Sequence, residues 1–226
     1  MAALILTACN SAPGEVSNEK ENKDLTMYTD LEKYIASLKT EMDSIPDDRK
    51  ELLEEMADFV RDSEDKAKLT FICTHNSRRS HLSQVWSAVA AHHYGFGDKV
   101  ETYSGGTEST AFNPRAVAAL ERSGFEVENP GGENPRYRVS FSENSEGMEC
   151  FSKKYDDPAN PSEGFLAVMT CSHADETCPF IPGAALRIPI PYDDPKESDG
   201  TERETETYDE RSRQIAAEMF YMMSKV

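Results

Sequence analysis

The sequence has few basic residues, few cysteines and no long apolar run. Its 226 residues include 24 Lys and Arg against 42 Asp and Glu, a formal net charge of −18. Such an acidic surface argues against nucleic acid and anionic membrane surfaces as partners. The 5 cysteines are too few for a disulfide scaffold at this length, and no apolar run reaches the ~20 residues that span a bilayer. The length fits one α/β domain plus an extension.

One stretch, residues 69–86, combines an apolar strand, a polar loop and a helix. The strand ends at Cys73, and Arg79 follows after five further residues. Helical spacing then begins, with apolar residues on one face at Leu82, Val85, Trp86, Val89 and Ala90. A loop that turns its N–H groups inward and ends on a helix N-terminus is an anion cradle. That dipole and Arg79 would stabilise a Cys73 thiolate, while the arginine fork matches two oxygens of a tetrahedral oxyanion.

Cysteine, five residues, arginine and then serine or threonine is the signature of cysteine-dependent phosphatases. The run CTHNSRRS from Cys73 to Ser80 resembles the low-molecular-weight protein tyrosine phosphatase superfamily and, within it, the thioredoxin-coupled arsenate reductase branch. The resemblance covers about residues 69–226 and implies an enzyme with Cys73 as its nucleophile. It also implies an oxyanion-binding loop that consists of Thr74, His75, Asn76, Ser77, Arg78, Arg79 and Ser80.

Two residues of this loop depart from the arsenate reductase pattern. His75 stands where that branch usually has glycine, and Arg78 stands where it usually has a second cysteine. His75 must therefore tolerate whatever backbone shape the glycine serves, and a left-handed conformation is less easy for it. If His75 distorts the loop, the chain would be an oxyanion-binding protein without turnover. Arg78 either adds charge near the anion site or faces solvent.

Residues 1–26 are expected to be a signal-like, disordered tether. Leu6-Thr7-Ala8-Cys9 resembles a bacterial lipoprotein signal that ends at a lipidated cysteine, although a basic n-region is missing. The alternative is a short apolar start of a cytoplasmic protein. The expected location is therefore the cytoplasm, or the periplasm and its membrane if Cys9 is lipidated, and a membrane would be a partner only through that anchor.

Residues 27–66 are expected to form an N-terminal helical hairpin. Two apolar helical stripes flank the break at Ile45-Pro46, and they consist of Leu31, Tyr34, Ile35 and Leu38, then Leu52, Leu53, Met56, Phe59 and Val60. Their apolar faces must pack on the catalytic domain or on another chain. Ordinary arsenate reductases lack such an extension, and we assign no chemistry to it.

Residues 67–226 are expected to form the catalytic domain, with an insertion at about 129–164 near the rim of the active site. Four strands alternate with helices, which predicts an α/β fold with a parallel sheet. Pro189 and Pro191 place the last strand at a sheet edge. The resemblance implies a four-stranded sheet of order 2-1-3-4 with helices on both faces.

Three chemically useful residues follow the carboxyl ends of strands, where ligands bind in such sheets. These are Cys73, Cys171 and Asp194. Asp194, next to Pro195, matches the superfamily's Asp-Pro general acid, which protonates the leaving oxygen. Asp157 stands in a similar Asp-Asp-Pro setting, but it precedes the third strand, so we prefer Asp194.

A second constellation is Cys171 and Cys178, with six residues between them. In the arsenate reductase branch, the first cysteine of such a pair attacks the arsenylated nucleophile and releases arsenite. The second takes over the resulting disulfide and presents it to thioredoxin, which requires a mobile loop. The alternatives are a structural disulfide and a zinc site at Cys171, His173 and Cys178, which lacks a fourth ligand. We expect no metal and no cofactor.

Two enzyme classes therefore remain open. The first is an arsenate reductase with a three-cysteine relay, for which a thioredoxin-like reductant is the expected partner. The second is a protein tyrosine phosphatase, in which water resolves a cysteinyl-phosphate intermediate. The cysteine pair favours the reductase, as does Lys196, where tyrosine phosphatases of the superfamily tend to carry an aromatic residue. Export would cut the enzyme off from cytosolic thioredoxin and would favour the hydrolase.

Overall fold

The central element is a parallel four-stranded sheet in the order β2-β1-β6-β7. Its strands are β1 (Ala67–Cys73), β2 (Val100–Gly106), β6 (Phe165–Met169) and β7 (Ala184–Pro189). The predicted order 2-1-3-4 and the edge position of the last strand are confirmed. The structure is a computed structural model that describes residues 26–226, so the lipoprotein-like signal and Cys9 lie outside the described residues.

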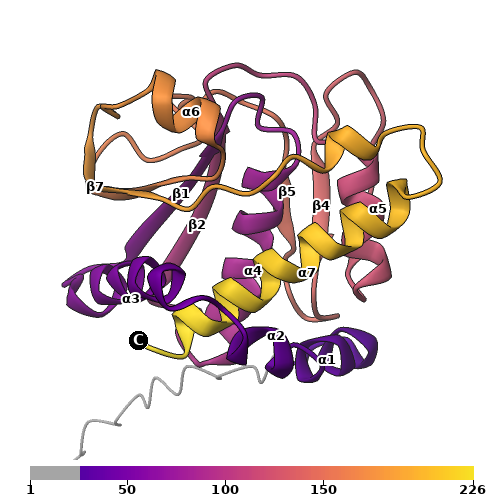
Figure 1. The fold of residues 1–226 in the computed structure, drawn as a ribbon, viewed down its shortest axis with the longest axis horizontal. Helices are drawn as coiled ribbons and strands as arrows, with labels where there is room; N and C mark the ends of the chain where they lie inside the picture. Colours follow the sequence, from indigo (N-terminus) through magenta and orange to yellow (C-terminus); the bar gives the residue numbers. More distant parts are fainter. Residues whose placement is uncertain (1–25) are drawn as a thin grey trace, which may run out of the picture.

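The two faces of the sheet bury different sets of side chains. On one face Leu69 and Phe71 of β1 join the main core with α4 (Arg79–His93), α5 (Pro114–Arg122) and α7 (Glu204–Met223). Trp86 of α4 is fully buried there, with the rings of Tyr34, Phe125 and Phe220 around it. On the other face Ile72, Phe165 and Met169 form a smaller cluster with α6 (Ser172–Thr177). The sheet is thus covered on both faces (Figure 1).

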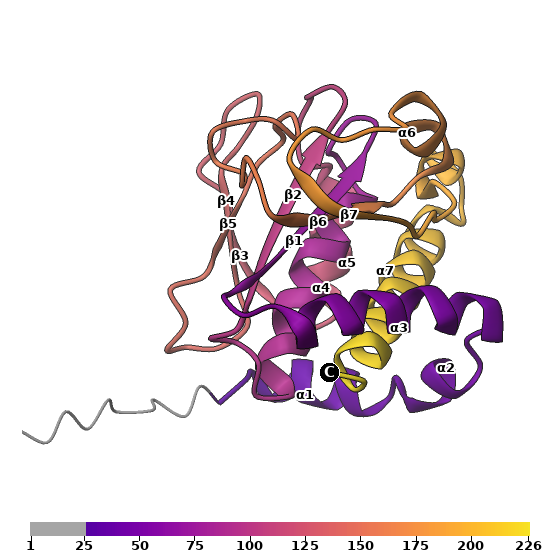
Figure 2. The same cartoon turned by 90° about the vertical axis from the view of Figure 1, so that its left-hand side faces the viewer.

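The N-terminal extension contains three helices instead of the two arms of a hairpin. These are α1 (Thr29–Ala36), α2 (Lys39–Asp43) and α3 (Asp47–Asp62). The predicted first arm is interrupted after Ala36, whereas the break at Pro46 lies as expected, immediately before α3. The apolar faces pack on the same chain, because α2 and α3 both lie against α7, and α3 crosses α7 in Figure 2.

The segment at 129–164 contributes to a second, antiparallel sheet in the order β3-β4-β5. Its strands are β3 (Glu126–Glu128), β4 (Tyr137–Ser140) and β5 (Met148–Cys150). The sequence did not predict this sheet, because strands of three or four residues carry too little alternation to be seen. The 3₁₀ helix η1 (Pro195–Ser198) follows the last strand of the main sheet. Within residues 26–226, no helix is both long and apolar enough to cross a bilayer.

The buried face of α3 provides a test of whether the extension shares the core of the catalytic domain. Leu53 is fully buried in the main core, so Leu53→Ala should lower the free energy of unfolding by about 2–5 kcal/mol. The neighbouring Glu51 is exposed, and Glu51→Ala should change it by less than about 0.5 kcal/mol. Urea unfolding should show one transition for the whole chain; a separate early transition in Leu53→Ala would contradict a shared core.

Candidate active site

The loop between β1 and α4 is held by its carbonyl groups. The carbonyl of Thr74 accepts from the Glu108 N–H at 2.8 Å, and that of Ser77 accepts from the Asn113 N–H at 2.8 Å. The carbonyl of His75 accepts from the Ser152 hydroxyl at 2.9 Å. Within residues 26–226, by contrast, the N–H groups of residues 74 to 80 donate to no protein acceptor. The loop therefore presents a row of free donors, which is the arrangement that binds an oxyanion.

Asn76, and not His75, adopts the left-handed backbone conformation. Its φ is +44°, and within the described residues no other non-glycine residue has a positive φ. Asparagine tolerates this region better than most residues, and its side chain fixes the turn. The Asn76 amide donates to Ser80 Oγ at 2.9 Å and accepts from the Lys153 N–H at 2.9 Å. His75 therefore does not have to adopt the left-handed conformation that would be difficult for it.

The Cys73 thiol lies at the centre of this loop. Its Sγ is 3.1 Å from Ser80 Oγ, and the residue is only 3% exposed. The thiol is free and lies beside the N-terminal turn of α4, which begins at Arg79. Cys73 is thus placed to act as a nucleophile.

Arg79 links the loop to the segment that follows β7. Its guanidinium donates to the Tyr192 carbonyl at 2.9 Å and to Asp194 Oδ2 at 2.6 Å. Its Nε is buried and has no hydrogen-bond partner among residues 26–226. Asp194 also caps η1 by accepting from the Lys196 N–H at 3.1 Å. The loop arginine and the preferred acid are therefore in direct contact, although they are far apart in sequence.

Arg78 is mostly buried and does not face solvent. Its Nε donates to the Tyr208 hydroxyl at 2.9 Å, and its guanidinium lies 3.7 Å from Asp199 and 3.9 Å from Asp194. Of the two alternatives for Arg78, the structure shows a charge placed beside the loop and not a side chain that faces solvent. The cation is largely compensated by two carboxylates.

Asp157, the alternative acid, is not brought to Arg79. Its Oδ1 accepts from the Ala159 N–H at 2.9 Å in a local turn, on the wall of a separate cavity of about 510 Å³ next to Pro158. This agrees with an aspartate that starts a turn at Asp-Pro.

Cys171 and Cys178 flank the short helix α6. Cys171 follows β6 directly, is 1% exposed, and its Sγ accepts from the Ala174 N–H as the N-cap. The same Sγ lies 3.4 Å from the hydroxyl of Thr74 in the loop. Cys178 is the C-cap and is partly exposed. The expected mobile loop is thus a helix here, and within the described chain all the cysteines are free thiols.

The zinc alternative has no support in the geometry. No group of three or more His, Cys, Asp or Glu side chains within residues 26–226 is gathered as a metal site. His173 instead lies 3.3 Å from the Thr74 hydroxyl, and α6 separates the two cysteines.

Several residues that hold the site were not found from the sequence. Ser152 and the Lys153 N–H come from the segment at 129–164 and bind the backbone and side chain of the loop. The Tyr192 carbonyl holds Arg79. No sequence signal identifies the Lys153 N–H and the Tyr192 carbonyl, because any residue type supplies such backbone groups. Gly106, the last residue of β2, also allows the close approach, since a Cβ there would lie 2.2 Å from the Glu108 carbonyl oxygen.

The family described as low molecular weight phosphotyrosine protein phosphatase matches residues 68–133. Arsenate reductase 2 of Staphylococcus epidermidis is 28% identical over 131 residues, which cover 58% of this chain and 80% of the relative. An arsenate reductase of Halalkalibacterium halodurans is 29% identical over 139 residues, 62% of this chain and 81% of the relative. A solved low-molecular-weight protein tyrosine phosphatase from T. tengcongensis aligns with a TM-score of 0.49 and 15% identity, over 71% of this chain and 100% of its own. The resemblance to the superfamily and to its arsenate reductases is confirmed, and the proteins it resembles are enzymes.

Gly106 provides a test of the cradle that requires no turnover. A Cβ there would also lie 2.7 Å from the Asn76 nitrogen and 2.8 Å from the Thr74 carbonyl oxygen, so Gly106→Ala must displace the loop. We expect inorganic phosphate to bind at least about tenfold more weakly in isothermal titration calorimetry, a loss of about 1.4 kcal/mol.

Gly97→Ala is the matched control, because a Cβ at Gly97 meets nothing closer than 3.5 Å. That variant should bind phosphate as the wild type does. Unchanged phosphate affinity in Gly106→Ala would mean that the anion binds elsewhere.

Proposed function

We propose that this chain is an arsenate reductase-like enzyme that combines the Cys73–Arg79 oxyanion loop with a relay of three thiols. The observation that carries the proposal is the Cys171 thiol, which lies 3.4 Å from the hydroxyl of the loop residue Thr74. A second thiol thus stands at the wall of the cradle that holds the first. The similarity to curated arsenate reductases over most of their length supports the same chemistry.

In the first step the Cys73 thiolate attacks the arsenic of a bound arsenate. The free N–H groups of the loop and the Arg79 guanidinium hold the oxyanion and stabilise the charge that develops on it. Hydroxide leaves as water after it takes a proton from Asp194, which acts as general acid. The product of this step is a covalent arsenic–sulfur bond at Cys73.

In the second step the Cys171 thiolate attacks Cys73 Sγ. A disulfide forms between Cys73 and Cys171, the sulfur–arsenic bond breaks, and its electron pair stays on arsenic, which leaves as arsenite. Cys178 then attacks Cys171, which releases the Cys73 thiolate and leaves a Cys171–Cys178 disulfide. A thioredoxin-like dithiol reduces that disulfide and thereby supplies the two electrons.

This relay requires α6 to unwind. Helix α6 places Cys171 and Cys178 at its two ends, about 10 Å apart at a rise of about 1.5 Å per residue. A disulfide needs Cα atoms within about 4.4–6.8 Å. A helix of 6 residues is far below the length that is stable by itself, so opening it is a small local event.

The second candidate function is a protein tyrosine phosphatase. It is favoured by one feature of the same region, namely that intact α6 holds the two thiols too far apart to bond. In this reaction Cys73 takes the phosphoryl group, Asp194 protonates the phenolate that leaves, and water then hydrolyses the cysteinyl phosphate. Neither Cys171 nor Cys178 is needed for that cycle.

Asp194 is tested against Asp157 by leaving-group dependence. Asp194→Asn should slow hydrolysis of phenyl phosphate by about 100-fold or more, and of p-nitrophenyl phosphate far less, because a basic leaving oxygen depends more on protonation. With arsenate, whose leaving group is also basic, turnover should fall as for phenyl phosphate. Asp157→Asn is the control and should change either kcat less than twofold. The reverse pattern would move the acid to the segment at 129–164.

Serine variants of the two thiols separate the reductase from the hydrolase. Cys171→Ser should stop arsenate turnover after the arsenic–sulfur bond has formed, since no thiol remains to break it. Cys178→Ser should permit one turnover and then stall as a Cys73–Cys171 disulfide. Mass spectrometry of the thiols after a single turnover reads both outcomes directly.

Two controls accompany this experiment. Cys73→Ser should form no adduct, because a hydroxyl is not ionised as a cradle thiolate is, and Cys150→Ala should complete the relay. Burial raises the pKa of the Cys150 thiol to about 12, so this cysteine supplies no thiolate. If both Cys171→Ser and Cys178→Ser retain full phosphatase turnover while arsenate leaves the wild-type thiols unchanged, the hydrolase is the function.

A further inference from the structure

We infer that Arg49 of the N-terminal extension positions the general acid, so that this extension is part of the catalytic machinery. The inference rests on the proposed role of Asp194, and it applies to either chemistry. It starts from a buried ion pair between α3 and α7 that the reaction itself does not use.

The ion pair joins Arg49 of α3 to Glu218 of α7. Two N–H groups of Arg49 donate to Glu218 Oε2, Nε at 3.0 Å and Nη2 at 2.9 Å. The side chains are 14% and 4% exposed. A buried carboxylate needs such partners, because an unpaired charge in the interior is strongly unfavourable. Glu218 therefore fixes where the guanidinium of Arg49 lies.

Arg49 and Glu218 together hold the segment between β7 and η1. The same Nη2 of Arg49 donates to the Pro191 carbonyl at 3.2 Å, and the guanidinium carbon lies 4.8 Å from the centre of the Tyr192 ring. The Tyr192 hydroxyl donates to Glu218 Oε2 at 2.8 Å. Burial raises the pKa of Tyr192 well above its ordinary value, so the hydroxyl keeps its proton and remains a donor.

The backbone of Tyr192 connects the Arg49–Glu218 pair to the loop that contains Arg79. Its N–H donates to the Thr170 carbonyl at 3.2 Å, and its own carbonyl accepts from Arg79 at 2.9 Å. Asp194, two residues further on, accepts from the same guanidinium at 2.6 Å. The position of Tyr192 thus sets where Arg79 and Asp194 meet, and Arg49 contacts the ring of the same residue.

Lysine is the informative substitution at Arg49. Arg49→Lys keeps a positive charge beside Glu218, so the carboxylate is not left unpaired in the interior. A single ammonium on a shorter chain cannot contact Glu218, the Pro191 carbonyl and the Tyr192 ring together. The variant should fold while the Tyr192 segment loses its fixed position.

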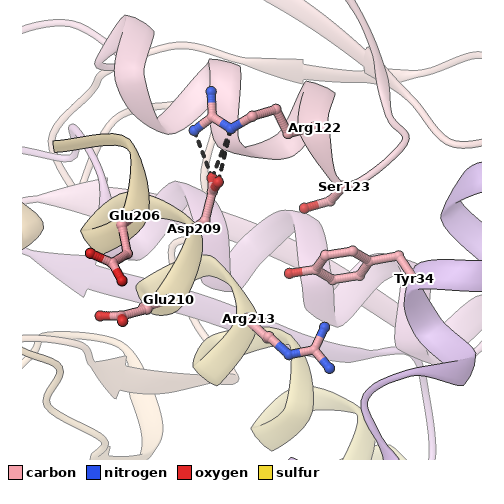
Figure 3. Close-up of a pocket in the computed structure, with 7 residues that line it drawn as sticks. All are labelled: Tyr34, Arg122, Ser123, Glu206, Asp209, Glu210 and Arg213. Carbon is pink, nitrogen blue, oxygen red and sulfur yellow. Dashed lines mark hydrogen bonds and ion pairs between the residues drawn. The ribbon is translucent and has the colours of Figure 1, made fainter. Parts of the chain in front are cut away.

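Arg213→Lys is the matched control. Arg213 also joins α7 to the extension, where it donates to Glu41 and to the Ser37 carbonyl. It lies beside the Tyr34 ring, at a pocket next to the Arg122–Asp209 ion pair (Figure 3). Its contacts do not include the segment 190–194.

The first measurement is a double-mutant cycle on kcat with arsenate or phenyl phosphate, whichever the wild type turns over. Arg49→Lys should lower kcat about tenfold and change KM less than twofold, since a misplaced acid slows proton transfer without weakening oxyanion binding. In an Asp194→Asn background the same change should lower kcat less than twofold further, because the acid is already absent. Arg213→Lys should leave kcat within twofold of the wild type. Equal losses from Arg49→Lys with and without Asp194 would overturn the inference.

The second measurement needs no turnover and therefore separates this inference from the proposed function. Amide hydrogen exchange of residues 190–198 should rise at least tenfold in Arg49→Lys and stay unchanged in Arg213→Lys. Wild-type protection of that segment in Arg49→Lys would overturn the inference even if the enzyme is active. Inactive wild-type protein with the expected exchange pattern would instead remove the proposed function and leave the structural coupling.

Discussion

The rest of the site depends on one constraint, which is that donors from other segments hold the carbonyls of Thr74, His75 and Ser77 in the loop after β1. Within residues 26–226 the N–H groups of residues 74 to 80 have no protein acceptor, and a buried donor without a partner costs about 1–3 kcal/mol. The protein meets that cost with contacts from three separate segments, through Glu108, Asn113 and Ser152. Gly106 allows two of these backbones to approach closely. In the proposed function, a bound oxyanion would satisfy these free donors.

The same constraint explains what the sequence predicted well. A strand, an anion loop and a helix are adjacent in the chain, so local pattern sufficed for Cys73, Arg79 and the apolar stripe of α4, which is fully buried. The alternation of strands with helices, and the prolines of the last strand, were enough for the parallel sheet and its edge. Asp194 and Cys171 were placed near the loop because each follows a strand's carboxyl end, and they do contact Arg79 and Thr74.

What the sequence did not predict depends on backbone atoms or on distant pairs. His75 was singled out as the residue that would have to tolerate an unusual backbone shape, whereas the left-handed residue is Asn76, and no pattern in the sequence marks that position. The second sheet was missed because its strands are short, and α6 was missed because polar residues between two cysteines are typical of a loop. Arg49 and Glu218 are 169 positions apart in the sequence. The spacing of apolar residues cannot predict a contact between two residues so far apart.

The charges around the loop also show how substrate binding and acid catalysis would be coupled. The chain is acidic overall, and even the two arginines at the loop are compensated, Arg79 by Asp194 and Arg78 largely by Asp199. A dianion that enters the cradle competes with the Asp194 carboxylate for the same guanidinium. As the proposed general acid, Asp194 would carry a proton, which removes that competitor and also supplies the leaving oxygen. In the proposed reaction one proton therefore serves both binding and chemistry, which is a reason for the acid and the oxyanion arginine to be in contact.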